Sequence, residues 1–311
     1  MTIGIATRNS ALAKAQASQV AEQLGGAELV EVSSDGEVGD KERFVRGVEQ
    51  ALLAGKAEIG VHSAKDLPAE IPDGLIIAAV PPREDPADVW IADLAQNSDI
   101  SRVKRQGASL ADVAKGARVG TASLRRRAQL LAARPDLEVS ALHGNVDTRL
   151  RKLAEGELDA IVLAAAGLRR LGREHEAGFS IPAEEMTPAA GQGALVLQAR
   201  EGDADAIAAA AAIGDETALR ELTAERAVVA LLDATCATPI GVHATVRDAA
   251  EEIDGGSLLI EAFVGLPDGS EWIRDRVEGD AAEPAVAGAL LAERLLGAGA
   301  REILDRAEAL A

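Results

Sequence analysis

Residues 118–134, RVGTASLRRRAQLLAAR, place a short apolar strand pattern directly before a helix pattern. The turn between them carries Thr121 and Ser123, whose side chains can cap the start of a helix. Apolar residues then recur at helical spacing until Pro135, which ends the helix. A strand that enters a helix through a polar turn is half of a β-α-β unit, so this stretch predicts an α/β fold.

The same alternation occurs on both sides of this stretch. Upstream, strand patterns occupy residues 2–7, 27–33, 57–63 and 75–82, with helix patterns between them from Ser10 and over 44–55; downstream, they occupy 138–144 and 159–167, with a helix over 146–156. Such alternation predicts an open, mostly parallel sheet covered by helices. We therefore predict two α/β domains, formed by residues 1–82 with about 190–212 and by residues 86–188, although no sequence repeat is visible.

From about Asp215 the pattern changes. A long helical pattern over 216–234 precedes strand patterns at 242–248, 257–265 and 272–279, and the turn LPDGSE at 266–271 predicts a hairpin. Two alanine- and leucine-rich helical stretches follow. Strands followed by helices, without alternation, predict a small α+β domain over residues 215–311.

Composition excludes several classes of protein. The chain of 311 residues is 48% apolar, 27% charged and only 2% aromatic, which is typical of a globular protein with an aliphatic core. No apolar run reaches the roughly 18 residues that span a bilayer. The first residues lack the pattern of a signal peptide, so we expect a cytoplasmic protein.

Charge is unevenly distributed along the chain. The net charge is −19, yet residues 118–152 carry +5 and the remainder −24. The acidic total disfavours nucleic acid and anionic membranes as partners. The basic segment predicts a local pocket for a small anion, although solvated helix faces explain some of these arginines equally well.

Polar clusters follow the predicted strands at 6–10, 62–66, 120–127 and 143–149. Because ligands of open α/β sheets bind beyond the carboxyl ends of strands, two facing domains with such loops predict a cleft. In the cluster at 62–66, Lys65 and Asp66 form either an acid/base pair or a surface ion pair. In the cluster at 120–127, Arg125 and Arg126 suit a ligand with several carboxylates or phosphates.

Two further features leave alternatives open. Gln192 lies between Gly191 and Gly193, where it either contacts a ligand or marks a crossover between domains. Cys236 is the only cysteine and lies in the turn LLDATCATPIG at 231–241, so it cannot form an internal disulfide. It is either a small buried apolar residue or a reactive sulfur at a site.

With these loops in this order, the chain resembles the porphobilinogen deaminase family, also called hydroxymethylbilane synthases. The matching stretches include IATRNSALAKAQA at 5–17, VHSAKDLP at 61–68, PPREDPAD at 81–88, VGTASLRRRAQL at 119–130, LHGNVDTRLRKL at 142–153, DAIVLAAAGLRRLG at 159–172, GQGALVLQAR at 191–200, ETALRELTAERA at 216–227 and CATPIG at 236–241. They cover nearly the full length of the chain.

The resemblance implies a fold, a reaction and a set of residues. The fold is two α/β domains like those of periplasmic binding proteins, facing a cleft, with a small C-terminal α+β domain. The reaction is the condensation of four porphobilinogens, with loss of ammonia, onto a dipyrromethane cofactor held by a thioether to Cys236. Hydrolysis then releases hydroxymethylbilane, in a monomeric enzyme that needs no metal ion.

By the same resemblance Asp66 is the catalytic acid/base. The residues implied to bind the cofactor, besides Cys236, are Lys65, Arg125, Arg126, Thr121, Ser123 and Ser63. Those implied to bind substrate are Arg8, Ser10, Arg83, Arg149, Gln192, Phe44 and His143.

Phe44 and His143 stand where the sequence departs from the family pattern. His143 replaces an arginine before Gly-Asn-Val, and the loop that precedes Phe44 is short. These departures keep a second hypothesis open, a non-catalytic two-lobed protein that binds anions. A third hypothesis, nucleic-acid binding through residues 124–135, has little support because aromatic residues are scarce and the chain is acidic.

Overall fold

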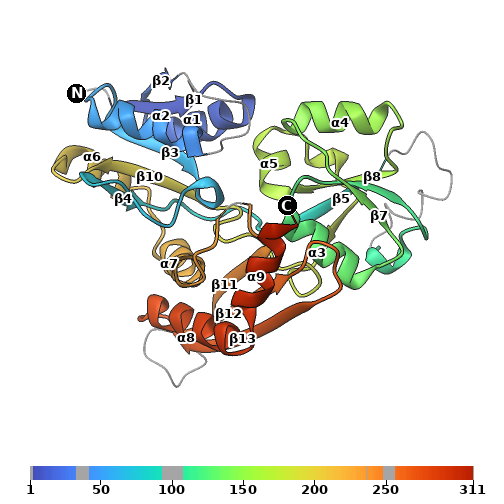
Figure 1. Ribbon diagram of the computed structural model, residues 1–311. Helices are drawn as coiled ribbons and strands as arrows, with labels where there is room; N and C mark the ends of the chain where they lie inside the picture. Colours follow the sequence, from blue (N-terminus) through green and yellow to red (C-terminus); the bar gives the residue numbers. More distant parts are fainter. Residues whose placement is uncertain (1–2, 33–41, 93–107, 236, 248–255, 311) are drawn as a thin grey trace.

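The computed structural model describes residues 3–32, 42–92, 108–235, 237–247 and 256–310, and they form three bodies, each with its own sheet (Figure 1). None of the helices in these ranges is long and apolar enough to cross a membrane.

The first lobe is built on a five-stranded sheet in the order β2-β1-β3-β10-β4. Its strands are β1 (Gly4–Arg8), β2 (Glu28–Val32), β3 (Ile59–Ser63), β4 (Leu75–Ala79) and β10 (Leu195–Arg200). Its helices are α1 (Ala11–Gln23), α2 (Glu42–Leu53) and α6 (Ala204–Ala211), and the one-turn helix η1 (Ala64–Asp66) follows β3. β1 pairs in parallel with β2 and β3, whereas β10 is antiparallel to both of its neighbours.

The second lobe has a sheet in the order β7-β6-β8-β5-β9. Its strands are β5 (Asp88–Ala92), β6 (Arg118–Gly120), β7 (Glu138–Ser140), β8 (Ala160–Ala164) and β9 (Phe179–Ile181). Its helices are α3 (Leu124–Ala133), α4 (Val146–Ala154) and α5 (Ala165–Arg170), with short turns η3 (Leu110–Asp112) and η4 (Glu174–Glu176). Here β6 is parallel to β7 and β8, and β5 is antiparallel to β8 and β9.

The two sheets therefore share one topology, which the sequence does not reveal as a repeat. In the spatial order of each sheet, three parallel strands lie beside one antiparallel strand, which is the first strand after the chain crosses from the other lobe. This strand is β5 in the second lobe and β10 in the first. The prediction of two α/β sheets is confirmed, but each sheet is mixed because the crossover strand runs the opposite way.

The chain passes between the lobes twice, through an outgoing crossover at residues 80–87 and a return crossover at residues 182–194, and these two segments lie side by side. Gly193 has a φ of +90°, and a Cβ there would stand 2.1 Å from the carbonyl oxygen of Glu84 on the other segment. The backbone N–H of Glu84 donates to the carbonyl oxygen of Gly193 at 3.2 Å. Only glycine allows both this conformation and this approach.

The C-terminal body is a three-stranded antiparallel sheet with helices. Its strands are β11 (Ile240–Arg247), β12 (Ser257–Gly265) and β13 (Trp272–Asp280), in that order, and its helices are α7 (Glu216–Leu231), α8 (Pro284–Gly297) and α9 (Ala300–Ala309). The predicted hairpin is confirmed, since Gly265 pairs with Trp272. A core of aliphatic side chains from the sheet and these helices lies between them. The residue limits of the three predicted domains remain a prediction.

Candidate functional site

A cavity of about 240 Å³ lies between the two lobes, where several strand-to-helix turns meet. The first lobe contributes residues from β1, the start of α1, the end of β3 and η1, and the second contributes residues from α3, α4 and α5. In the part of the chain that the structure describes, five cationic side chains line it: Arg8, Lys65, Arg126, Arg149 and Arg170.

Local sequence fixes the turns that present these side chains. Ser10, Ser123 and Asn145 are the N-caps of α1, α3 and α4, and each side chain accepts a hydrogen bond from the backbone N–H three residues later. These caps hold the helix starts at the carboxyl ends of the preceding strands. The sequence prediction of a cleft bordered by such turns is confirmed.

The cavity lining is strongly positive. Among the described lining residues Asp147 is the single carboxylate, and it is ion-paired with Arg173 outside the lining. Arg149 donates from Nε to the carbonyl oxygen of Gly144 at 2.8 Å. Burial and the nearby charge of Arg126 lower the pKa of Arg149 to about 10, so it remains protonated at neutral pH. The arrangement suits a ligand with several anionic groups.

Lys65 and Asp66 follow β3 on η1. Burial, and secondly the charge of Arg126, lower the pKa of Lys65 to about 8, while the neighbouring Asp66 acts in the opposite direction. The Lys65 Nζ lies 3.5 Å from Gln192 Oε1. Lys65 lines the cavity, whereas Asp66, the next residue, is absent from the lining.

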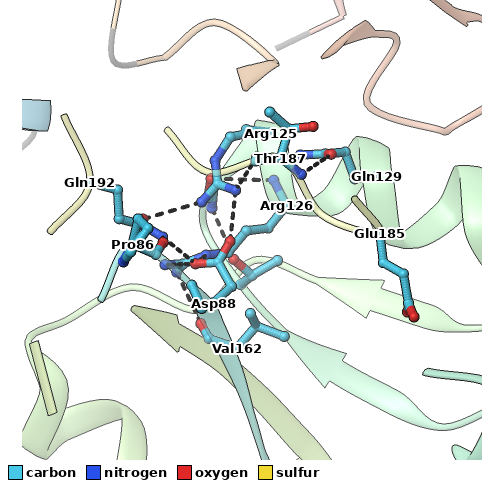
Figure 2. A network of polar contacts seen from close by, with 12 residues as sticks. Pro86, Asp88, Arg125, Arg126, Gln129, Val162, Glu185, Thr187 and Gln192 are labelled. Atoms are coloured by element: carbon cyan, nitrogen blue, oxygen red, sulfur yellow. Dashed lines mark hydrogen bonds and ion pairs between the residues drawn. The ribbon is translucent and has the colours of Figure 1, made fainter. Parts of the chain in front are cut away.

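Behind the cavity, Asp88 at the start of β5 holds both predicted arginines (Figure 2). Its carboxylate lies 2.7 Å from Arg125 Nη1 and 2.8 Å from Arg126 Nη2, and it accepts a hydrogen bond from Gln192 Nε2 at 2.9 Å. Burial raises the pKa of Asp88, but the two guanidinium groups outweigh it and hold this pKa far below its usual range.

The structure separates the roles predicted for this arginine pair. Arg126 lines the cavity, but Arg125 does not: its Nη1 also donates to the carbonyl oxygen of Thr187 at 2.8 Å, and it is buried. Arg125 thus connects the lobe to the return crossover. Its position behind the cavity follows from Asp88, which the sequence prediction did not include.

Arg83 is likewise placed away from the cavity lining. Its guanidinium lies 2.8 Å from Glu225 and 3.4 Å from Glu221 on α7, and its Nε donates to the carbonyl oxygen of Gln192. Glu225 is fully buried and also accepts from the backbone N–H groups of Gly191 and Ala244. Arg83 therefore joins the crossovers to the C-terminal body.

Of the two roles that the sequence left open for Gln192, a ligand contact or a crossover between domains, the structure favours the crossover. It lies on the return crossover, donates from Nε2 to the carbonyl oxygen of Pro86 at 2.6 Å and to Asp88, and approaches Lys65. It is buried and absent from the cavity lining. In this structure it connects the two crossovers rather than facing the cavity.

The other predicted residues are distributed as follows. Ser10 and Ser63 line the cavity, and Ser63 is hydrogen-bonded to Gln16. Thr121 and Ser123 lie in the turn before α3, where Ser123 caps the helix and Thr121 Oγ1 accepts from the Ser123 N–H. His143 is exposed and outside the lining.

Two predicted residues lie wholly or partly outside the description. Cys236 and residues 35–41 of the short loop at 35–43 are outside the described residues, and Phe44 is placed on α2 by its backbone alone.

Sequence reasoning missed Asp88 and Arg170. Arg170, on α5, lines the cavity, and its Nη2 donates to the carbonyl oxygen of Gly193 at 2.7 Å. Its Nε is buried and has no hydrogen-bond partner among the described residues. Asp88 could have been noticed as an acidic residue at the start of an apolar strand. Its partners Arg125 and Arg126 lie 37 and 38 residues away, so the sequence does not reveal the ion pairs.

Known proteins resemble the chain over nearly its whole length. The family model "Porphobilinogen deaminase, dipyromethane cofactor binding domain" matches residues 3–208, and "Porphobilinogen deaminase, C-terminal domain" matches residues 219–297. The porphobilinogen deaminase of Thiobacillus denitrificans is 41% identical over 320 residues, covering 98% of both chains. That of Syntrophus aciditrophicus is 42% identical over 319 residues, again covering 98% of each.

Proposed function

The chain belongs to the porphobilinogen deaminase family, and on this premise we propose that it is a transferase that makes hydroxymethylbilane from four porphobilinogens. In each condensation the bond from the aminomethyl carbon to nitrogen breaks, ammonia leaves, and a carbon–carbon bond forms to the next pyrrole. One water molecule then releases the linear tetrapyrrole, a precursor of porphyrins and haem.

The cationic cavity lining is the observation that supports this proposal. Porphobilinogen carries an acetate and a propionate, so every ring added to the growing chain brings two carboxylates. Among the described lining residues, five cationic side chains stand against one carboxylate, which is itself ion-paired, and they supply positive charge for such a product.

The donor set also fits a dipyrromethane, which carries the same acidic groups. Arg126, Arg149 and Arg170 would hold its carboxylates. The Nε–H of Arg170 is a buried donor that has no hydrogen-bond partner among the described residues. Bound through Cys236, the cofactor would supply the terminal pyrrole carbon to which the first substrate is joined. Cys236 follows α7 by five residues in the sequence.

Asp66 is the residue that we propose for proton transfer. A carboxylate beside the reacting pyrroles can stabilise positive charge on their nitrogens and accept the ring proton that each condensation displaces. Its neighbour Lys65 lines the cavity, and both residues lie on the one-turn helix η1 that follows β3.

The intact mass of the purified protein tests the cofactor part of the proposal. Protein from cells that make porphobilinogen should exceed the mass of the bare chain by one dipyrromethane, and Cys236→Ser should lack this increment. A parent chain that stays bare after incubation with porphobilinogen or hydroxymethylbilane would contradict the assignment and favour the non-catalytic anion-binding alternative.

The variant Asp66→Asn tests the catalytic part. Loss of general acid/base catalysis should lower kcat at least on the order of a hundredfold while circular dichroism and cofactor mass are retained. Asp73→Asn is the matched control, because Asp73 is an exposed acid on the loop that follows. An Asp66→Asn enzyme as active as this control would remove Asp66 from the mechanism.

A further inference from the structure

Helix α7 of the C-terminal body holds the chain directly after Asp66. Arg226 Nη2 donates to the carbonyl oxygens of Pro68 at 2.8 Å and Ala69 at 2.7 Å, and Nη1 donates to that of Leu67 at 3.4 Å. The guanidinium is largely withdrawn from solvent, and burial lowers its pKa. Three consecutive carbonyl groups of one loop are thus bound by a single side chain from another body.

The preceding residue of the same helix holds the other side of the turn. Glu225 accepts from the N–H of Gly191 at 2.6 Å, and Gly191 packs tightly on η1, where a Cβ would stand 2.7 Å from that of Ala64. Gly191 adopts a φ of +71°, so no other residue fits both the conformation and the space. η1 therefore lies between the segment bound by Glu225 and the segment bound by Arg226.

Apolar packing joins the same elements. Ala64 and Leu67 flank Lys65 and Asp66, and both belong to a buried cluster with Ala218 and Leu222 of α7. The turn that carries the acid/base pair is therefore packed against α7 as well as hydrogen-bonded to it. A guanidinium can bind three carbonyl groups in one plane with fixed geometry, which an ammonium cannot.

We propose that Arg226 is a positioning residue for the reaction: by binding the carbonyl groups of residues 67–69 it fixes Lys65 and Asp66 relative to the cavity. The proposal rests on the proposed function, because it presupposes that Asp66 takes part in catalysis. Since α7 also leads to the segment that contains Cys236, one helix sets the position of the catalytic turn and the start of the segment that bears the cofactor thiol.

The test compares Arg226→Met and Arg226→Lys with a matched control, Arg200→Met. Arg200 likewise donates to two backbone carbonyl oxygens, those of Leu52 in the last turn of α2 and of Ala57, but it is absent from the cavity lining and from the contacts around η1. Each holoenzyme is checked for cofactor mass and thermal unfolding, and kcat and KM for porphobilinogen are then measured separately.

Arg226→Met should lower kcat at least tenfold with KM within twofold of the parent, because a displacement of about 1 Å at a catalytic group can cost a hundredfold in rate. Arg226→Lys should recover part of that loss, and Arg200→Met should keep the parent kcat even if it unfolds at a lower temperature. If Arg226→Met does not fold, the comparison of Arg226→Lys with Arg200→Met decides.

Both Arg226 variants matching Arg200→Met in kcat would overturn the proposal, as would a rise in KM with kcat unchanged. Asp66→Asn, measured in parallel, separates the two levels of inference. An inactive Asp66→Asn with fully active Arg226 variants refutes only the positioning role, whereas an active Asp66→Asn refutes the proposed function itself.

Discussion

The two lobes share a strand order, yet they bury different polar groups at the middle of their sheets. The second lobe buries an ionised carboxylate, Asp88, between two arginines. The first buries His62 on β3 near Gln198 of β10, and the Nε2 atom of His62 has no hydrogen-bond partner among the described residues.

The difference shows how each lobe tolerates a buried titratable group. Asp88 keeps its charge because two guanidinium groups and an amide meet it within hydrogen-bonding distance. His62 faces a positive charge, that of Arg8, and burial lowers its pKa to about 4, so it is neutral at pH 7. One lobe thus depends on an ion pair and the other on the absence of a proton.

The largest effect on stability is expected from removing the buried negative charge of the second lobe. Asp88→Asn leaves Arg125 and Arg126 buried without their counter-charge, which should lower the free energy of unfolding by about 3–5 kcal/mol. Urea denaturation at pH 7 measures the change. Asp159→Asn is the control, since solvent screens its exposed pair with Arg118 and the free energy of unfolding should change much less. Equal losses in both variants would contradict the importance of the buried network.

The buried neutral His62 of the first lobe predicts that the stability of the fold depends on pH. An unfolded histidine binds its proton near pH 6.5, whereas folded His62 does so only near pH 4, so the unfolded state is favoured as the pH falls between these values. The contribution of neutral His62 to the free energy of unfolding is complete above about pH 6.5, and roughly 3 kcal/mol of it is lost by about pH 4.

His62→Gln should flatten that dependence, as measured by urea denaturation at several pH values between 7 and 4. Burial raises the pKa of Glu49, which acts in the opposite direction in parent and variant alike, so the difference between the two curves isolates His62. His175→Gln, at an exposed position, should keep the parent curve. Parallel curves for parent and His62→Gln would refute the assignment.

The smallest effect is expected from removing a single charge from the cavity between the two lobes. Arg149→Gln removes one cationic side chain from the lining and should lower kcat/KM for porphobilinogen about tenfold, equivalent to about 1.4 kcal/mol. Arg151→Gln is the control, because Arg151 lies on the same helix, exposed, and pairs with Glu155. If both variants bind and turn over substrate alike, the cavity is not where porphobilinogen carboxylates are held.

Much of the fold was predictable because its signals are local. Hydrophobic periodicity, helix caps and the turn at 266–271 each depend on neighbouring residues, and the structure places strands, helices and the hairpin accordingly. The antiparallel direction of β5 and β10 was not predictable in this way, because it depends on where the chain crosses between lobes.

For the site, the sequence by itself identified the polar turns, and with them Arg8, Lys65, Arg126 and Arg149 of the cavity lining. Only the tertiary structure decided that Arg125 and Arg83 lie behind the cavity, because their carboxylate partners, Asp88 and Glu225, are 37 and 142 residues away. Both carboxylates are buried, and which arginine meets them depends on packing between distant segments. An arginine-rich sequence therefore predicts an anion site, whereas packing between distant segments decides which arginines face it: Arg125 and Arg126 both pair with Asp88, yet only Arg126 lines the cavity.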